Sequence, residues 1–468
     1  MLSHSQAPAR AKPLGLAFIT AILICVVLNP LNSSTLSVAL PVLLHALHTS
    51  PSGITWIISG YYLGSAVSQP VMGKLGDAWG RARFVYVGLA VMIATALLAP
   101  LSQSLDSFVI WRVIQALGTS MIYPNAIGLI REHRSQDVGK ILGWIGMASG
   151  TAVAVGPTVG GFLIDLASWH AIFWLNIPLA VIAIGLLLWV LPKYSSVSHL
   201  HDIKKQTANR IEKRLDRIDW AGILLFTAAM TSWLLWFNTK HRFVSHGVLD
   251  LVLGLLFTTA LVAAELRHTA PVLPIRWFYR PQFSLSSVIA VLSNLVMYCI
   301  LYGLPIFLET VRRFSATQSG LVLLAFAGVM SLASPWGGRF AQGKTRRFPL
   351  LLAGGFLVLG TLVLCWVNVL NMGELIVGLA LIGMSFAISN VVIQQIVLES
   401  APKQETGQAS GVYTLLRYVG TMLSSVFVGS SISTASGAQT LFVLLTGASL
   451  LTAALTLGLR DTLRQESI

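Results

Sequence analysis

The feature of this sequence that most constrains its fold is a series of long apolar segments. Charged residues, prolines and glycines divide the sequence into about fourteen such segments. Most of the segments reach the roughly 20 residues that an α-helix needs to cross a bilayer. An open strand would leave its backbone groups unpaired in lipid, and the segments are about twice as long as a barrel strand. The sequence therefore predicts an all-α polytopic membrane protein.

The predicted spans follow one another along most of the chain. The first begins after Arg10 and Lys12 and is too long for the apolar part of a signal peptide, so we expect an uncleaved first span. The spans cover residues 14–40, 54–73, 84–102, 108–130, 140–163, 170–191, 219–238, 247–266, 283–308, 318–338, 349–368, 374–398, 406–430 and 439–459.

Composition excludes a soluble protein. Only 10% of the residues are charged, whereas an ordinary soluble domain is roughly a quarter charged. The net charge of +14 would suit a nucleic-acid partner, but the basic residues lie in short loops between apolar segments, where they act as topology signals. We therefore expect no nucleic-acid partner.

The motifs of cofactor and metal chemistry are missing from the sequence. There is no phosphate-binding loop with Gly-Lys-Ser/Thr, no HExxH and no recognisable pair of nucleophile and base. Cys25, Cys299 and Cys365 lie inside apolar segments and have no CxxC partner. We expect no cofactor, no metal site and no enzymatic activity.

The basic residues predict the orientation in the membrane. With the N-terminus inside, four Lys and Arg fall outside, two fall within spans, and the other 25 of the 31 fall on the cytoplasmic side. This predicts a multi-pass protein of the cytoplasmic (inner) membrane with both termini in the cytoplasm. The loop at 193–218 is rich in Lys and Arg, and two interpretations stay open, a solvated connector and a contact with anionic membrane lipid.

An internal repeat predicts the domain organisation. At a shift of 265, Pro70 aligns with Pro335 and Arg81 aligns with Arg346. Parallel repeats are typical of secondary transporters, whose substrate site lies between the two halves near the midplane of the membrane. We predict an N-terminal six-helix bundle (1–192), the basic loop (193–218), two extra helices (219–266) and a C-terminal six-helix bundle (267–468).

The loop after the second span carries a possible gate. It contains glycines for tight turns, an acid that can accept from an Arg or a helix N-terminus, and basic residues. Such a contact can form in one conformation and break in another, whereas the simpler interpretation is a basic turn. The proposed gating residues are Gly73, Asp77, Gly80, Arg81 and Arg83.

These segments resemble the major facilitator superfamily, in particular its fourteen-span drug:proton antiporter branch. Residues 73–83 are similar to the family's signature between spans two and three, and Arg112-x-x-Gln115 is similar to its proton-transfer motif. Leu31–Pro41, Trp169–Pro178 and Gly407–Gly411 also resemble that branch. Span five resembles the family's antiporter signature, although Ala152 stands in place of one of its glycines. The matching residues are Gly143, Gly156, Pro157, Gly160 and Gly161.

One position departs from the branch. Asn32 stands where the branch usually has an acidic residue with a role in proton or cation handling. An amide does not titrate, so that role does not transfer to this position. Asn32 instead supplies hydrogen bonds, either to a substrate or to a neighbouring helix.

Two arginines are predicted inside the membrane. By helix rise, Asn32, Arg112 and Gln115 lie about 6 to 13 Å below the outer side, and Arg417 lies about 17 Å from the cytoplasmic side. A charge at that depth should face a cavity or a polar partner. Because no acid falls in the middle of a span, we expect a cavity suited to neutral, zwitterionic or anionic amphiphiles.

Proton coupling would need a titratable group, and Glu309 is the first candidate. It follows Leu304-Pro305 at the outer end of span nine. The alternative is a rim carboxylate paired with Arg312 or Arg313, three and four residues on. Asp165 and Asp77 are weaker candidates.

Polar and aromatic residues predict a wall for the substrate. Asn294, Tyr298 and Tyr302 recur every fourth residue, so they share one helix face. Each wall residue taken singly has a simpler role in helix–helix contact. The candidates are Asn29, Ser34, Tyr61, Gln69, Tyr123, Asn294, Tyr298, Tyr302, Asn390 and Gln394.

The predicted function is export of small amphiphilic compounds by alternating access, in exchange for protons. The exchange rests on the resemblance, and Asn32 favours an alternative, a facilitator or metabolite exporter without proton coupling. A receptor or partner subunit without transport is a third hypothesis. The intact segment 73–83 argues against it, because a non-transporting member should have lost its gate.

Overall fold

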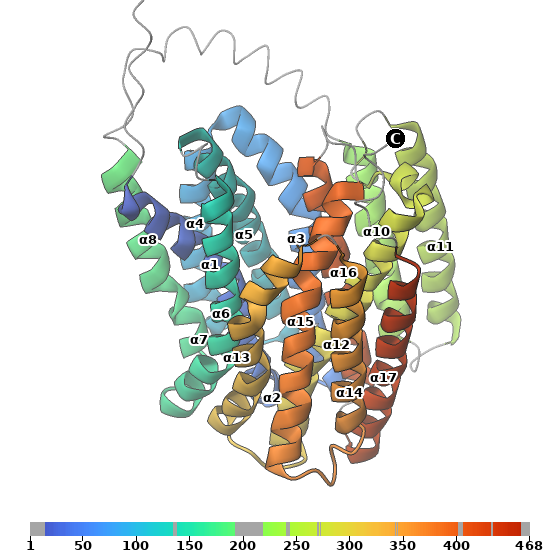
Figure 1. Cartoon of the computed structure of the whole chain (residues 1–468). Coiled ribbons are helices and arrows are strands. Elements are labelled where there is room, and N and C mark those ends of the chain that lie inside the picture. The colour runs from blue at the N-terminus through green and yellow to red at the C-terminus, as the bar shows by residue number, and fades with distance from the viewer. Residues whose placement is uncertain are drawn as a thin grey trace, which may run out of the picture.

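We describe a computed structural model of the chain at residues 15–133, 138–191, 219–239, 244–268, 271, 273–341, 343, 345–400, 406–431 and 434–459. This part is helical almost throughout and contains no strand, which confirms the predicted all-α class (Figure 1). The basic loop 193–218 lies outside the described residues, and so does the side chain of Asp77.

A helix lies at each predicted span. In the first half these are α1 (Leu16–Ser37), α2 (Leu40–Ala46), α3 (Pro51–Trp79), α4 (Arg81–Leu98), the 3-10 turn η1 (Ala99–Leu101), α5 (Leu105–His133), α6 (Val138–Leu166), α7 (Ala171–Trp174) and α8 (Asn176–Val190). The inserted pair, as we call the two extra helices, consists of α10 (Trp220–Thr239) and α11 (Val244–Arg267). In the second half they are η4 (Ile275–Tyr279), α12 (Pro281–Thr310), α13 (Ala316–Ala341), α14 (Arg347–Leu364), α15 (Met372–Ser400), α16 (Thr406–Ser431) and α17 (Ala435–Leu457).

Not every one of these helices has the length and hydropathy of a membrane span. Among the described residues, 11 helices are long and apolar enough to cross a bilayer, and α6 makes up to 12 if its two bent parts form one span. Helix α10 contributes only a shorter apolar stretch, Trp220–Trp236. The count of fourteen crossings therefore stays a prediction.

Helix α6 bends by 40° between its parts Trp144–Val153 and Val155–Leu166. Pro157 lies just beyond the break. A proline ring collides with the carbonyl four residues earlier, which here belongs to Val153, and it also removes one backbone hydrogen bond. The bend therefore has a local cause in the sequence.

The helices form two bundles with the inserted pair at their flank (Figure 1). One apolar core fills the first bundle around α1, α4, α5 and α8, and another fills the second around α12, α15 and α16. The largest core extends across both bundles. The bundles meet along two seams, α6 against α13 and α3 against α16, and α10 packs beside the second seam.

The internal repeat has a counterpart in three dimensions. Arg81 at the start of α4 pairs with Glu132 at the end of α5, with 3.2 Å between Nη1 and Oε1. Its repeat partner Arg346 pairs with Glu399 at the end of α15, and its Nη2 lies 2.7 Å from Oε1. Each half thus fixes the same turn to the same neighbouring helix.

Candidate functional site

A cluster of tyrosines joins the two bundles at the centre of the molecule. The hydroxyl of Tyr62 on α3 lies 3.3 Å from the hydroxyls of both Tyr298 and Tyr302 on α12. The ring of Tyr62 also lies 5.3 Å from that of Tyr418 on α16. The predicted face of α12 therefore meets a partner in the other bundle, and a ligand between the bundles would face phenol groups.

Arg112 is enclosed on the first-bundle side of this cluster. Its guanidinium donates to Gln115 and lies 4.3 Å from the centre of the Tyr61 ring, in cation–π contact. Within the described part, Arg112 Nε, Gln115 Nε2 and Asn32 Nδ2 are buried and have no hydrogen-bond partner. An unpaired buried donor costs roughly 1–3 kcal/mol, so these three donors are suited to a bound polar group.

Arg417 is the corresponding cation of the second bundle. Its Nε donates to Asn294 Oδ1 at 3.2 Å, and its guanidinium lies 5.9 Å from the ring of Tyr413. Tyr413 in turn donates to Asn390 Oδ1 at 2.5 Å. The predicted wall residues Asn294 of α12 and Asn390 of α15 thus lie near one half-buried charge on α16.

The other wall candidates have different surroundings. Tyr61 donates to Asn29 at 2.9 Å, and Gln69 donates to Tyr418 across the seam at 3.2 Å. The Ser34 hydroxyl bonds to backbone carbonyls, including that of Ala152 on α6 at 3.1 Å, so it joins α1 to α6. Tyr123 and Gln394 are half-buried.

The glycines of α6 permit two close helix contacts. A side chain at Gly160 would meet the Thr35 carbonyl of α1 at 2.8 Å, and Gly156 faces Ser34. Gly161 faces the backbone of Ala316 on α13. In the same way, Gly320 of α13 faces the backbone of Pro157 on α6. These residues therefore pack α6 on both α1 and the other bundle. The surroundings of Gly143 lie outside the described residues.

The segment 73–83 forms a sharp turn between α3 and α4. Gly80 has φ +106°, a conformation that favours glycine, and a side chain at Gly76 would overlap Asn125 of α5. Gly73 faces Pro124 of the same helix. Arg83 is exposed at the start of α4.

Glu309 lies beside the predicted outer end of the α6–α13 seam. It is half-buried, its Oε1 is enclosed without a hydrogen-bond partner in the described part of the chain, and Ser319 and Asp165 act on its carboxyl group electrostatically. Arg312 donates to the carbonyls of Val367 and Leu370, at 2.6 and 2.9 Å, so its guanidinium is engaged with the backbone. The Glu309 carboxylate thus faces the seam.

Several residues of the site were missed by sequence reasoning. Tyr62 and Tyr418 complete the tyrosine cluster, and Ser59 bonds to Ser425 across the seam at 2.6 Å. Their only signal in the sequence is position, since Tyr62 follows Tyr61 and Tyr418 follows Arg417. Which of two neighbours faces the other bundle depends on helix rotation.

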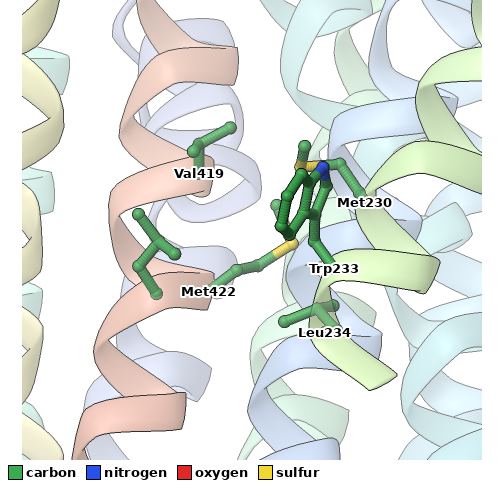
Figure 2. Close-up of a pocket in the computed structure, with 6 residues that line it drawn as sticks. Met230, Trp233, Leu234, Val419 and Met422 are labelled. Carbon is green, nitrogen blue, oxygen red and sulfur yellow. The ribbon is translucent and has the colours of Figure 1, made fainter. Parts of the chain in front are cut away.

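An apolar cavity of about 250 Å³ lies between α10 and α16. Figure 2 shows Met230, Trp233 and Leu234 of α10 opposite Val419 and Met422 of α16. None of the predicted site residues lines it.

Comparisons with known proteins agree with this architecture. A sequence profile described as Major Facilitator Superfamily matches residues 22–425. The chain is 35% identical over 419 residues to the uncharacterized MFS-type transporter YwoD of Bacillus subtilis (strain 168), covering 88% of this chain and 89% of that protein. It is 29% identical to the tetracenomycin C resistance and export protein of Streptomyces glaucescens, covering 87% of this chain and 74% of that protein.

A solved structure shares the fold. The crystal structure of the nucleoside transporter NupG aligns with a TM-score of 0.65 and 11% identity, covering 94% of this chain and 99% of that one. At this identity the likeness concerns the fold alone.

Proposed function

The chain belongs to the Major Facilitator Superfamily, and from that premise we propose that it exports small amphiphilic compounds across the cytoplasmic membrane in exchange for protons. Alternating access would proceed by rocking of the two bundles about the tyrosine cluster. The names of some relatives, such as the tetracenomycin C resistance and export protein, support export as the direction.

The observation that carries the proposal is the composition of the layer between the bundles. It holds two arginines, Arg112 and Arg417, with phenols and amides around them. Three buried donors, on Asn32, Arg112 and Gln115, have no hydrogen-bond partner among the described residues. Aromatic rings would contact the apolar part of an amphiphile, and the N–H donors would donate hydrogen bonds to one of its oxygen atoms. Neutral, zwitterionic or anionic compounds fit this layer better than lipophilic cations.

The test uses inside-out vesicles with an acid interior and a panel of cationic, neutral and anionic amphiphiles. We expect uptake of neutral or anionic compounds together with a rise of internal pH. If lipophilic cations were the best substrates and neutral compounds were not transported, the proposed substrate class would be wrong. Vesicles with Arg112→Ala test the site itself, and we expect at least a tenfold loss of uptake.

Glu309 is proposed as the residue that carries the proton. Its half-buried carboxyl lies at a seam between the bundles and has one enclosed oxygen without a hydrogen-bond partner among the described residues. In Glu309→Gln we expect substrate-dependent proton release to disappear. The matched control is Glu374→Gln, because Glu374 is an exposed acid at the start of α15. Proton release that persists in Glu309→Gln would contradict this assignment.

Asn32 supports a second candidate function, a facilitator without proton coupling. It is buried, its amide nitrogen has no partner within the described part, and it cannot titrate. Uptake that leaves internal pH unchanged and survives an uncoupler would favour this candidate over antiport.

A further inference from the structure

The inserted pair contacts both bundles at the α3–α16 seam. Ile223 of α10 packs against Val71 of α3, and both side chains are buried. Higher along α10, Phe226 packs in a cluster that includes Ala66 of α3 and Leu415 of α16. If the bundles rock against each other, α10 cannot keep both contacts unchanged.

A buried acid fixes the start of α10 beside α3. Asp219 is 2% exposed, and its Oδ1 accepts from the backbone N–H of Gly222 at 2.7 Å, as an N-cap. Its Oδ2 lies 3.9 Å from His268 Nδ1, and its charge acts on the ammonium of Lys74. Lys74 shares a face of α3 with Val71, three residues earlier. The apolar contact between α3 and α10 therefore lies one helical turn from Lys74 and one from Asp219.

A second buried acid lies beside Asp219. Glu265 of α11 is 3% exposed, and its Oε1 accepts from the backbone N–H of Leu273 at 3.2 Å. A side chain at Gly222 would lie 2.6 Å from Glu265 Oε1 and would overlap Asp219 Oδ2, so the two carboxylates flank this glycine. Buried charges require partners, and Lys74 supplies a positive charge from the first bundle.

The contact of α10 with α16 is of a different kind. It contains the apolar cavity of about 250 Å³, lined by Met230 and Trp233 on one side and Met422 on the other (Figure 2). Methionine adapts its shape to irregular surroundings, and a loosely filled apolar contact has no directional bond to break. This contact can therefore change register more easily than the one with α3.

The repeat offers a comparison for Lys74. A shift of 265 aligns Lys74 with Arg339 of α13, which is exposed. Lys74 is half-buried, so the two repeat positions have different surroundings.

We propose that the inserted pair is fastened to α3 by the packing of Ile223 on Val71, with the buried Asp219 at the start of α10 as a positioning residue, so that α10 and α11 move with the N-terminal bundle and slide on α16. This inference rests on the alternating access of the proposed function. It assigns the inserted pair to one of the two moving bodies and makes the α10–α16 contact the moving surface.

Distance measurements between spin labels test the assignment directly. A label at Leu224 of α10 is paired with one at Leu16 of α1 or with one at Phe348 of α14, all three being exposed. The bundles are driven apart by Gly161→Val or, if that variant does not fold, by Gly320→Val. We expect the Leu224–Phe348 distance to shift by at least about 5 Å, one helical turn, and the Leu224–Leu16 distance to stay. The opposite pattern would overturn the proposal.

Asp219→Asn isolates the charge, because the amide oxygen can still cap α10. We expect the Leu224–Leu16 distance distribution to broaden and turnover to fall about tenfold, equivalent to ~1.4 kcal/mol. Arg267→Gln is the control, since it removes an exposed charge from the same end of α11. Lys74→Gln should have the same effect as Asp219→Asn, and the double variant should be no worse than either.

The two proposals fail separately. If the labels move as expected while the protein transports none of the compounds tested, the inserted pair is assigned correctly and the proposed export is wrong. If Asp219→Asn leaves both the distances and the turnover unchanged, the positioning role of Asp219 is wrong whatever the protein transports.

Discussion

The two seams between the bundles are built in different ways. At the α6–α13 seam the backbones nearly touch, with Gly161 against Ala316 and Gly320 against Pro157. Thr158 donates to the Gly320 carbonyl at 3.1 Å, and Asp165 accepts from the Thr317 N–H at 3.1 Å. At the α3–α16 seam, side chains meet instead, through Ser59 with Ser425 and Gln69 with Tyr418.

This difference indicates how each seam should respond to change. Where two backbones touch, there is no room for an added carbon atom, so a larger side chain cannot take the place of the glycine. A contact between side chains can lose one bond and keep the helices in place. We therefore expect abrupt effects at the first seam and graded effects at the second.

The largest effect is expected for Gly161→Val. The new side chain would overlap the backbone of Ala316, so the α6–α13 seam should not close, and transport should fall by about a hundredfold or more, equivalent to ~3 kcal/mol. Uptake into vesicles measures the loss. The control is Gly146→Val on the same helix, because nothing lies within 4 Å of a side chain added there. Equal activity of the two variants would remove the distinction between the seams.

A smaller effect is expected for Tyr62→Phe. The change removes one hydroxyl that lies 3.3 Å from two others, at a cost of roughly 1–2 kcal/mol. We expect a five- to thirtyfold weaker transport with an unchanged fold, measured by uptake and by thermal unfolding. The neighbouring change Tyr61→Phe serves as a comparison, because Tyr61 bonds within its own bundle. If Tyr61→Phe were the more harmful, the tyrosine cluster would not be the functional contact between the bundles.

The smallest effect is expected for Ser425→Ala. A hydrogen bond between membrane helices is worth about 0.6 kcal/mol on average, so transport should change by no more than about threefold. The measurement is uptake into vesicles. The control is Ser430→Ala, because Ser430 is an exposed residue of the same helix. A tenfold loss in Ser425→Ala would show that the α3–α16 seam is as intolerant as the other one.

Sequence patterns predicted the helices well because their causes are local. Apolar length gave a helix at each of the predicted segments, and Pro157 and Gly80 produce a bend and a turn through their own backbone chemistry. The face of α12 that carries Asn294, Tyr298 and Tyr302 follows from helical spacing alone. The repeat at a shift of 265 aligned Arg81 with Arg346, and the structure adds that each forms an ion pair with the following span.

Contacts between helices were harder to predict. The sequence offers Arg312 and Arg313 as neighbours of Glu309, yet Arg312 donates to two carbonyls beyond α14. Ser34 was a wall candidate, and it bonds to the backbone of α6. In both places the deciding partner lies far away in the sequence, where neither spacing nor composition points to it.

Taken alone, the sequence determined that the chain forms apolar helices in two related halves, because hydropathy, proline, glycine and charge act within a few residues. Only the tertiary structure decided that α10 lies on α3, that the buried Asp219 caps the start of α10 and that the two seams differ in kind. Those features depend on how each helix is rotated and on which neighbour it packs against, and the free energy of packing is set by all the surrounding side chains together.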